Sequence, residues 1–313
     1  MENNLVSICI TTYNRKKLLP LTLKSILDQT YKNIEVIIVD DCSDDGTKEL
    51  IENGLLRLDK RIRYIRHKKN KGLAAGRNTA IFSAKGKYFT FCDDDDQLLS
   101  QFVEEFVKVA ESYDDSWCFC CGGTYVKDIR VIKHIYSEQN LSLRQAILNG
   151  YTPPVAGQFY HTKILKKVHG YNEKIKSGVD HDLWLTLSYY NLSIYFLALP
   201  LAMPNSNQEH ERMTNNFYKR SFLIDQSLNI WKKNFITIYG EQIYKNFCLQ
   251  YKFDIFQSFL IQFLKAKNAK EILKLIFYQN NIFFLPRVVK YIIIRIWKRK
   301  KDLVIIKPSH NIN

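Results

Sequence analysis

The chain has 313 residues, of which 46% are hydrophobic, so it can bury the core of one large domain plus an appendage and is not a disordered chain. Its formal net charge is +15. From Lys219 onward 18 basic residues stand against 5 acidic ones, so the first 218 residues are nearly neutral. An anionic partner is therefore expected at the C-terminal end of the chain.

The cysteines and the chain ends predict a cytoplasmic protein. Seven cysteines are scattered without a disulfide framework, which favours a reducing compartment. The Cys-Phe-Cys-Cys run at 118–121 lacks the spacing of a zinc site, and we interpret it as a buried strand. The N-terminus does not resemble a signal peptide, and no apolar run approaches the ~20 residues that span a bilayer.

In chain order, short β-branched runs alternate with segments of helical period. The predicted strands are 5–11, 34–39, 61–66, 88–92 and 117–125, and the predicted helices are 18–27, 47–58, 75–84 and 100–112. Such alternation predicts an α/β fold with a mostly parallel sheet, flanked by helices and joined by right-handed crossovers.

The second half of the chain changes character twice. Residues 151–204 are mixed, and beyond residue 217 the pattern is helical and rich in aromatic residues. We therefore expect a catalytic domain over 1–215, divided at about residue 110, and a basic helical extension over 216–313.

Polar clusters follow three of the predicted strands: 11–14, 40–41 and 93–96. Open parallel sheets bind ligands beyond the carboxyl ends of their strands, so we expect the three clusters to form one site. No G-x-G-x-x-G or P-loop follows the first strand, which argues against a dinucleotide cofactor. Tyr13 could instead stack on a nucleotide base, and Asp41 could accept the imide N–H of uracil or thymine. Each residue alone is equally compatible with ordinary turn chemistry.

The run Asp93-Asp94-Asp95-Asp96 is the strongest indication of a cation. Four adjacent carboxylates repel one another unless a positive charge lies among them. Mg²⁺ or Mn²⁺ takes oxygen ligands, commonly one or two carboxylates plus substrate phosphates. The alternative is a solvated acidic turn.

Four segments occur together in a recognisable order: SICITTYNR, SILDQTYKNIEVIIVDDCSDDGT, NKGLAAGRN and FTFCDDDD. They resemble the inverting family 2 glycosyltransferases with the GT-A fold, strongly over residues 5–110. The later GVDHDLW segment at 178–184 matches the same family less closely. The resemblance implies an inverting hexosyltransferase that uses a nucleotide-sugar donor and Mn²⁺ or Mg²⁺.

The resemblance also implies a role for individual residues. The donor-binding residues would be Thr11, Tyr13, Asn14, Asp41, Arg77 and Asp94. The metal-binding residues would be Asp93 and Asp95, as the outer members of the Asp-x-Asp motif, with His210 of QEHERMT closing over the metal or diphosphate. Asp180 would be the catalytic base, and Asp182 and Trp184 would contact the acceptor.

Three positions depart from the family pattern. Val179 stands where an acidic residue commonly precedes the base, Gly76 replaces a common alanine, and Ser100 replaces a common proline. None of these changes removes a charge that the chemistry needs. For Asp180 the alternative role is to cap a helix starting near Leu183, and for Trp184 it is packing in the core.

The segment Arg287–Lys301 has seven basic residues, no acidic residue and an apolar block. A helix of this kind lies in the interface of an anionic membrane, so we expect peripheral attachment at the inner face of the cell membrane. Alternatively, it is a solvated helix that packs its isoleucines on the catalytic domain. Nucleic acid is not an expected partner, because no recognition motif accompanies the charge.

Three functions remain open from the sequence. The favoured one transfers a sugar from a UDP- or dTDP-sugar to a hydroxyl of a lipid-linked saccharide, in surface polysaccharide or glycan assembly. The second transfers the sugar to a polyprenyl phosphate, which needs little base catalysis. The third is a nucleotide-sugar-binding or nucleic-acid-binding module without turnover.

Overall fold

A computed structural model describes residues 4–112, 117–126, 130–133, 141–144, 157–190, 192–203, 216–265 and 269–278, with residues 281, 284 and 286. The described strands are β1 (Val6–Thr12), β2 (Ile34–Asp40), β3 (Ile62–Arg66), β4 (Tyr88–Asp93), β5 (Gln97–Leu98), β6 (Trp117–Val126), β7 (Arg130–Lys133), β8 (Leu141–Ser142), β9 (Gln158–His161) and β10 (Ser193–Met203). The described helices are α1 (Leu19–Leu27), α2 (Thr47–Leu50), α3 (Leu56–Leu58), α4 (Leu73–Ser83), α5 (Phe102–Ala110), α7 (Thr162–Lys167), α8 (Val179–Ser188), α9 (Phe217–Tyr239), α10 (Glu241–Lys265) and α11 (Ala269–Phe277).

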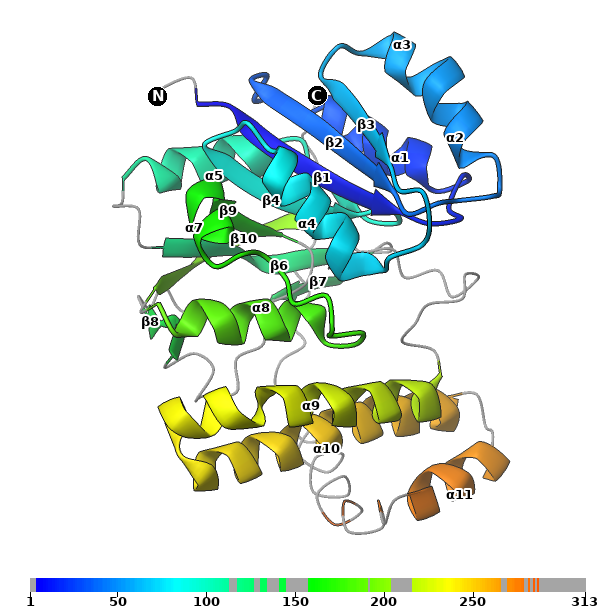
Figure 1. The fold of residues 1–313 in the computed structure, drawn as a ribbon, viewed down its shortest axis with the longest axis vertical. Coiled ribbons are helices and arrows are strands. Elements are labelled where there is room, and N and C mark those ends of the chain that lie inside the picture. Colours follow the sequence, from blue (N-terminus) through cyan, green and yellow to red (C-terminus); the bar gives the residue numbers. More distant parts are fainter. Residues whose placement is uncertain are drawn as a thin grey trace.

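The described strands form one sheet in the order β3-β2-β1-β4-β9-β6-β10-β5, with β7 beside β6 and β8 beside β10 (Figure 1). β1 runs parallel to β2 and β4, β2 runs parallel to β3, and β6 runs parallel to β10. β9 lies antiparallel between β4 and β6. The mostly parallel sheet with flanking helices is therefore confirmed.

Both faces of the sheet are covered by helices, which explains the almost wholly apolar strands. Side chains alternate between the two faces of a strand. In β1, Ile8 and Ile10 join the core that contains Leu23 of α1 and Phe106 of α5. Cys9 points to the opposite face and joins the core that contains Ile81 of α4.

The helix predicted for residues 47–58 is interrupted. A π-helical turn, Ile51–Leu55, separates α2 from α3. Gly54 lies in this turn, and glycine weakens a regular α-helix because it has no side chain to restrict the backbone.

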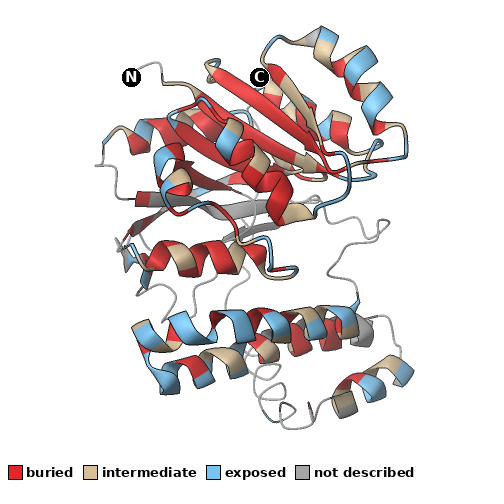
Figure 2. Ribbon diagram, in the orientation of Figure 1, coloured by how far each residue is buried: buried red, intermediate tan, exposed pale blue. Residues whose placement is uncertain are grey.

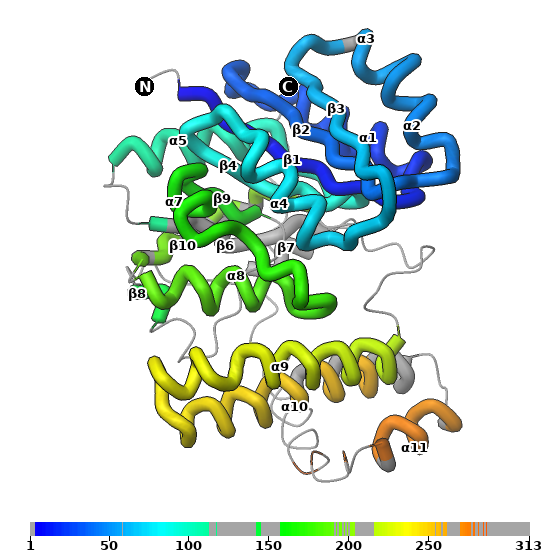
Figure 3. The backbone as a smooth tube through the Cα atoms, in the orientation of Figure 1, coloured from blue at the N-terminus to red at the C-terminus, as the bar shows by residue number. Residues whose placement is uncertain are grey.

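The expected helical C-terminal part is confirmed as α9, α10 and α11. In Figures 1 and 3, α8 lies between the sheet and the antiparallel pair α9 and α10. Trp184 of α8 and Phe235 of α9 belong to one buried cluster, and Figure 2 shows exposed residues on the outer faces of α9 and α10. The boundary at residue 215 between two domains stays a prediction. None of the described helices combines the length and apolar character needed to cross a bilayer.

Candidate functional site

Strand register brings the three polar clusters to one edge of the sheet. Thr12 at the end of β1 pairs with Asp40 at the end of β2. Thr11 pairs with Asp93 at the end of β4. The clusters therefore lie side by side at the carboxyl ends of parallel strands, the edge at which open α/β sheets bind ligands.

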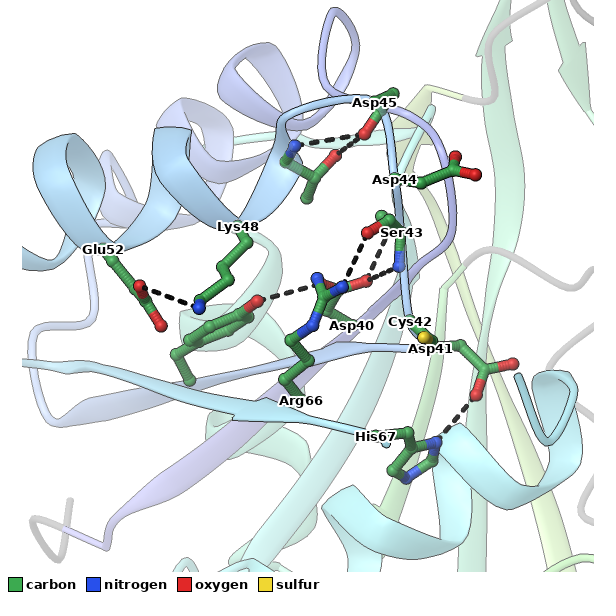
Figure 4. A network of polar contacts seen from close by, with 12 residues as sticks. Asp40, Asp41, Cys42, Ser43, Asp44, Asp45, Lys48, Glu52, Arg66 and His67 are labelled. Carbon is green, nitrogen blue, oxygen red and sulfur yellow. Dashed lines mark hydrogen bonds and ion pairs between the residues drawn. The ribbon is translucent and has the colours of Figure 1, made fainter. Parts of the chain in front are cut away.

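Asp40 is a structural residue that holds the loop after β2. Its Oδ1 accepts hydrogen bonds from the backbone N–H of Ser43 at 2.8 Å and from the Ser43 hydroxyl at 2.6 Å. Its Oδ2 accepts from the Tyr64 hydroxyl at 2.8 Å and from Arg66 Nη1 at 2.5 Å (Figure 4). The side chain is fully buried, so these four bonds compensate the loss of hydration of its charge.

Asp41 points away from Asp40, toward the loop after β3 (Figure 4). Its Oδ1 accepts from the backbone N–H of Lys71 at 2.8 Å, and its Oδ2 accepts from the backbone N–H of Gly72 at 2.7 Å. His67 Nδ1 lies 2.7 Å from the same Oδ1. Three groups thus fix the carboxylate before any ligand binds. His67 was missed from the sequence, because a lone histidine 26 positions away carries no motif.

Tyr13 and Asn14 lie in the loop after β1 and differ in their surroundings. Tyr13 is 46% exposed, so its ring is accessible to a ligand. Asn14 has a φ of 54°, in the left-handed region that asparagine tolerates. Its backbone N–H donates to Ser43 Oγ at 2.9 Å, and its Oδ1 accepts from the Asp44 N–H at 2.9 Å. Asn14 therefore joins two loops, and its direct contact with a donor stays a prediction.

Gly76 explains one departure from the family pattern. A Cβ added at Gly76 would lie 3.1 Å from Cγ2 of Thr11, closer than ordinary van der Waals contact. Glycine thus lets α4 approach β1 closely beside the site. The same approach places the next residue, Arg77, under the ends of the strands.

The charge of the aspartate run at 93–96 is partly balanced by two arginines. Arg77 Nη2 lies 2.9 Å from Asp93 Oδ1, and Arg15 Nη1 lies 3.4 Å from Asp95 Oδ2. The run therefore does not need a cation to neutralise all of its charge. The Asp93 side chain is 34% exposed and that of Asp95 is 12% exposed.

The other two aspartates of the run are buried. Burial, together with the neighbouring carboxylates of Asp93 and Asp95, raises the pKa of Asp94 to about 7, against the opposing effects of Thr12 and Arg15. The backbone N–H of Asp96 donates to the carbonyl of Asp93 at 3.0 Å, which closes a tight turn. This turn places alternate members of the run in different environments.

Arg77 is fully buried and joins the aspartate run to α8. Its Nη2 binds Asp93, while its Nη1 lies 2.5 Å from Asp180 Oδ1 and 3.2 Å from the Tyr171 hydroxyl. Its guanidinium also lies 5.0 Å from the centre of the Phe91 ring. Burial alone would lower the pKa of Arg77, but Asp180, Tyr171 and Asp93 raise it well above its usual value. The charged guanidinium therefore bridges two carboxylates 87 positions apart in the sequence.

Asp180 lies in the first turn of α8. The helix starts at Val179, four residues before the position expected from the sequence, because Gly178 turns the chain with a φ of 77°. Asp180 is therefore inside the helix rather than its cap. Its side chain is 17% exposed, and Tyr171 and Arg77 both contact its Oδ1.

Asp182 and Trp184 are both buried. Asp182 is 6% exposed, and its Oδ1 accepts from Trp231 Nε1 at 2.7 Å. Burial raises the pKa of Asp182, against the opposing effect of the Trp231 hydrogen bond. Trp184 is 2% exposed and donates to the Tyr160 hydroxyl at 3.1 Å. These contacts give both residues a packing role, and their contact with an acceptor stays a prediction.

Asp93 and Asp95 are the two carboxylates available to a divalent cation. In the described part of the chain, no three His, Cys, Asp or Glu side chains are placed to hold a metal together. Magnesium is commonly held by one or two carboxylates, with substrate phosphates and water completing its shell. The two partly exposed carboxylates fit this arrangement. His210 and the segment 287–301 lie outside the described residues.

Residues 7–168, just over half of the chain, match the model of the family described as glycosyl transferase family 2. A Campylobacter jejuni protein named GalNAc(5)-diNAcBac-PP-undecaprenol beta-1,3-glucosyltransferase is 30% identical over 197 residues, which are 61% of this chain and 61% of that protein. The Escherichia coli UDP-Glc:alpha-D-GlcNAc-diphosphoundecaprenol beta-1,3-glucosyltransferase WfaP is 38% identical over 133 residues, 42% of this chain and 51% of that protein. The chain spans 31% to 65% of the length of the first curated relatives that it matches.

A structural comparison agrees with the fold. The crystal structure of residues 1–349 of S. aureus TarS in complex with UDP-GlcNAc superimposes with a TM-score of 0.57 at 18% identity. The match covers 86% of this chain and 90% of that one. At this identity the likeness extends to the GT-A fold alone.

Proposed function

The chain belongs to glycosyl transferase family 2, and we propose that it is a metal-dependent inverting hexosyltransferase. The proposed donor is a UDP- or dTDP-sugar, and the proposed acceptor is a hydroxyl of a lipid-linked saccharide. The observation that carries the proposal is the buried Arg77, which joins Asp93 at the strand edge to Asp180 on α8. It supports a site in which the diphosphate and the acceptor lie on opposite sides of one guanidinium.

The donor side rests on the residues after β1 and β2. Tyr13 offers an exposed ring on which a base can stack. Asp41 Oδ2 receives one hydrogen bond from Gly72 N–H and retains a lone pair for the imide N–H of a pyrimidine. We assign Thr11 to the site of the base and Asp94 to that of the ribose or the sugar. TarS, which has a similar fold, was crystallised in complex with UDP-GlcNAc, and this supports a UDP-sugar as the donor.

Asp93 and Asp95 would hold Mn²⁺ or Mg²⁺, with His210 as a further candidate ligand. When bound, the cation neutralises charge on the departing diphosphate. Arg77 and Arg15 already bind these two carboxylates and keep them oriented toward the strand edge.

Asp180 is the proposed general base. Arg77 and Tyr171 both contact Oδ1, so we assign Oδ2 to the acceptor hydroxyl. Oδ2 takes the proton as the hydroxyl oxygen attacks the anomeric carbon and the bond to the nucleoside diphosphate breaks. One displacement from the opposite face inverts the anomeric configuration and needs no protein nucleophile. The names of the C. jejuni and E. coli relatives support a saccharide linked to a polyprenyl diphosphate as the acceptor class.

The test begins with the nucleotide and then adds the acceptor. Calorimetric titration of UDP, dTDP and GDP, each with Mn²⁺ or with EDTA, should favour a pyrimidine nucleotide with metal. Transfer is then measured from UDP-glucose, UDP-galactose and UDP-GlcNAc to GlcNAc-diphosphoundecaprenol. Equal binding of all three nucleotides would contradict a pyrimidine site, and binding without transfer would leave only a nucleotide-binding module. Transfer to undecaprenyl phosphate in preference to the saccharide would favour the polyprenyl-phosphate reaction.

We also propose that the segment 287–301 attaches the protein to the inner face of the cell membrane. The support is its charge, seven basic residues and no acidic one. Sedimentation with phosphatidylglycerol vesicles should remove the full chain from solution at low salt and less of it at high salt. Binding to phosphatidylcholine vesicles alone would contradict an electrostatic attachment.

A further inference from the structure

The first turn of α8 is held by the C-terminal helices α9 and α10. Trp231 of α9 donates its indole N–H to Asp182 Oδ1 at 2.7 Å. The hydroxyl of Tyr251, in α10, lies 3.2 Å from His181 Nδ1. These contacts reach the two residues that directly follow Asp180.

The residues that precede Asp180 are held in the same way. Ser227 Oγ of α9 donates to the carbonyl of Ser177 at 2.8 Å. A Cβ added at Gly178 would lie 2.7 Å from the Tyr251 hydroxyl oxygen and 3.4 Å from the Trp231 ring. The helical extension therefore packs directly against the backbone on both sides of Asp180.

The turn is anchored in the core by the buried Val179 and Leu183, but it lacks a side-chain cap. Gly178 precedes the helix without any side-chain hydrogen bond to its first N–H groups. On the inner side, Arg77 fixes only Oδ1 of Asp180. A general base acts only when it lies within hydrogen-bond reach of its proton, and a misplacement of about 1 Å can cost ~10²-fold in rate.

We propose that Trp231 and Tyr251 are positioning residues that set the place of the Asp180 carboxylate through the first turn of α8. The proposal rests on the proposed function, because it assumes that Asp180 is the base. It gives the extension a role in the chemical step, beyond any contact with lipid. The extension lies after the residues that match the family model, which end at 168.

Two tyrosines of α10 supply a matched pair of variants. Tyr251→Phe removes the contact with His181, whereas Tyr244→Phe removes a bond to the Leu228 carbonyl inside the extension, at 2.8 Å. Both variants keep the ring and lose one hydroxyl in the full-length protein. We expect Tyr251→Phe to lower kcat about 10-fold with an unchanged KM for the UDP-sugar, and Tyr244→Phe to retain wild-type kcat.

Trp231→Phe is the second test, because it keeps an aromatic ring but cannot donate to Asp182. It should also lower kcat about 10-fold without changing the affinity for UDP. In an Asp180→Asn background, neither Trp231→Phe nor Tyr251→Phe should lower kcat further, since no base remains to be positioned. Melting temperatures of all the variants show that folded proteins are compared.

The outcomes separate the two proposals. If the wild-type protein transfers sugar and Tyr251→Phe behaves like Tyr244→Phe, the positioning role is wrong and the proposed function stands. If Trp231→Phe and Tyr251→Phe lower kcat in the Asp180→Asn background as much as they do in the wild type, Trp231 and Tyr251 have a general packing role and the inference is overturned. If Trp231→Phe does not fold, the comparison of Tyr251→Phe with Tyr244→Phe is the deciding test. Absence of transfer by the wild-type protein overturns the proposed function and this inference together.

Discussion

The strand edge that we assign to the donor, here called the donor edge, and the first turn of α8 are two parts of one candidate site. They are built by different means. At the donor edge, Thr11, Asp40 and Asp93 lie at the ends of neighbouring parallel strands, so backbone hydrogen bonding fixes their spacing. Asp180 lies on a helix whose first turn is contacted by residues of α4, of the loop before α8, and of α9 and α10. A sheet edge thus positions its residues through local register, whereas Asp180 depends on contacts between segments distant in the sequence.

This difference bears on what each part can tolerate. Hydrogen bonds of a central sheet are cooperative and buried, so single side-chain changes at the donor edge should leave its frame intact. The first turn of α8 is held by a few side-chain contacts, so the loss of any one of them should weaken it. Arg77 is the exception, since it contacts both parts.

The largest expected effect separates the two parts completely. Asp180→Asn keeps the size of the side chain but cannot take a proton, so transfer should fall by ~10²–10⁴. The affinity for UDP with Mn²⁺, measured by calorimetry, should change little, because the residues of the donor edge are untouched. Asp28→Asn, on the exposed surface of α1, is the control and should retain full activity. Wild-type turnover in Asp180→Asn would make Asp182 the next candidate base.

Arg77→Lys should damage both parts at once. Lysine cannot bond two carboxylates in the fork geometry of arginine, so Asp93 and Asp180 would lose a shared partner. Leaving one of the two carboxylates without its arginine hydrogen bond should cost about 1–3 kcal/mol of unfolding free energy, measurable by urea denaturation. The control Arg63→Lys breaks a partly exposed pair with Glu35 and should cost ~1 kcal/mol or less. Similar losses in both variants would contradict a central role for Arg77.

Asp95→Ala should affect the donor edge alone. With one of two carboxylates removed, the gain in UDP affinity that Mn²⁺ provides over EDTA should fall at least about 10-fold, since even the loss of a group that only supports a metal ligand costs about 10–100-fold. Affinity in EDTA should stay near the wild-type value, since Asp95 makes no predicted contact with the nucleotide. If Mn²⁺ still strengthens binding in the variant as in the wild type, Asp95 is not a ligand.

The smallest expected effect is a pH dependence of stability that arises from His181, in the first turn of α8. Burial lowers the pKa of His181 to about 4, with Arg220 acting in the same direction and Asp180 opposing it. An unfolded histidine protonates near pH 6.5 while the folded one stays neutral, so stability is present above that pH and is lost as pH falls toward 4. Between pH 7.5 and pH 5.5 the loss should be about 1.4 kcal/mol.

His181→Gln should remove this part of the pH dependence. Urea denaturation of the wild type and the variant at both pH values measures it directly. Equal losses of stability in the two proteins would show that His181 titrates normally in the folded state.

Much of the fold was predictable because its signals are local. Apolar or β-branched runs of five to seven residues marked the first four strands, and the structure places each of them within about one residue of the expected limits. The misplaced start of α8 has a physical cause. Gly178 in a left-handed conformation begins the helix at Val179, and no sequence pattern distinguishes that glycine from a loop residue.

The composition of the site was predictable, but the arrangement was not. Motif spacing indicated Asp41, Arg77 and Asp180 separately. The Arg77–Asp180 pair spans 103 positions and the Trp231–Asp182 bond spans 49, and such pairings arise only from tertiary packing. The two adjacent aspartates after β2 also differ in their surroundings. Asp40 is enclosed by hydrogen bonds within the protein, whereas Asp41 faces the opposite side.

The close approach at Gly178 limits how this chain can be recombined with others. A chimaera that replaced only the extension would set a new side chain against a glycine backbone that has no room for it. Residues 177–188 and the helices from 217 to 265 are therefore best exchanged as one unit. The strand edge that we assign to the donor lies before that unit and can be kept. A hybrid that exchanges α8 together with α9 and α10 should therefore show a higher melting temperature than one that exchanges α9 and α10 alone.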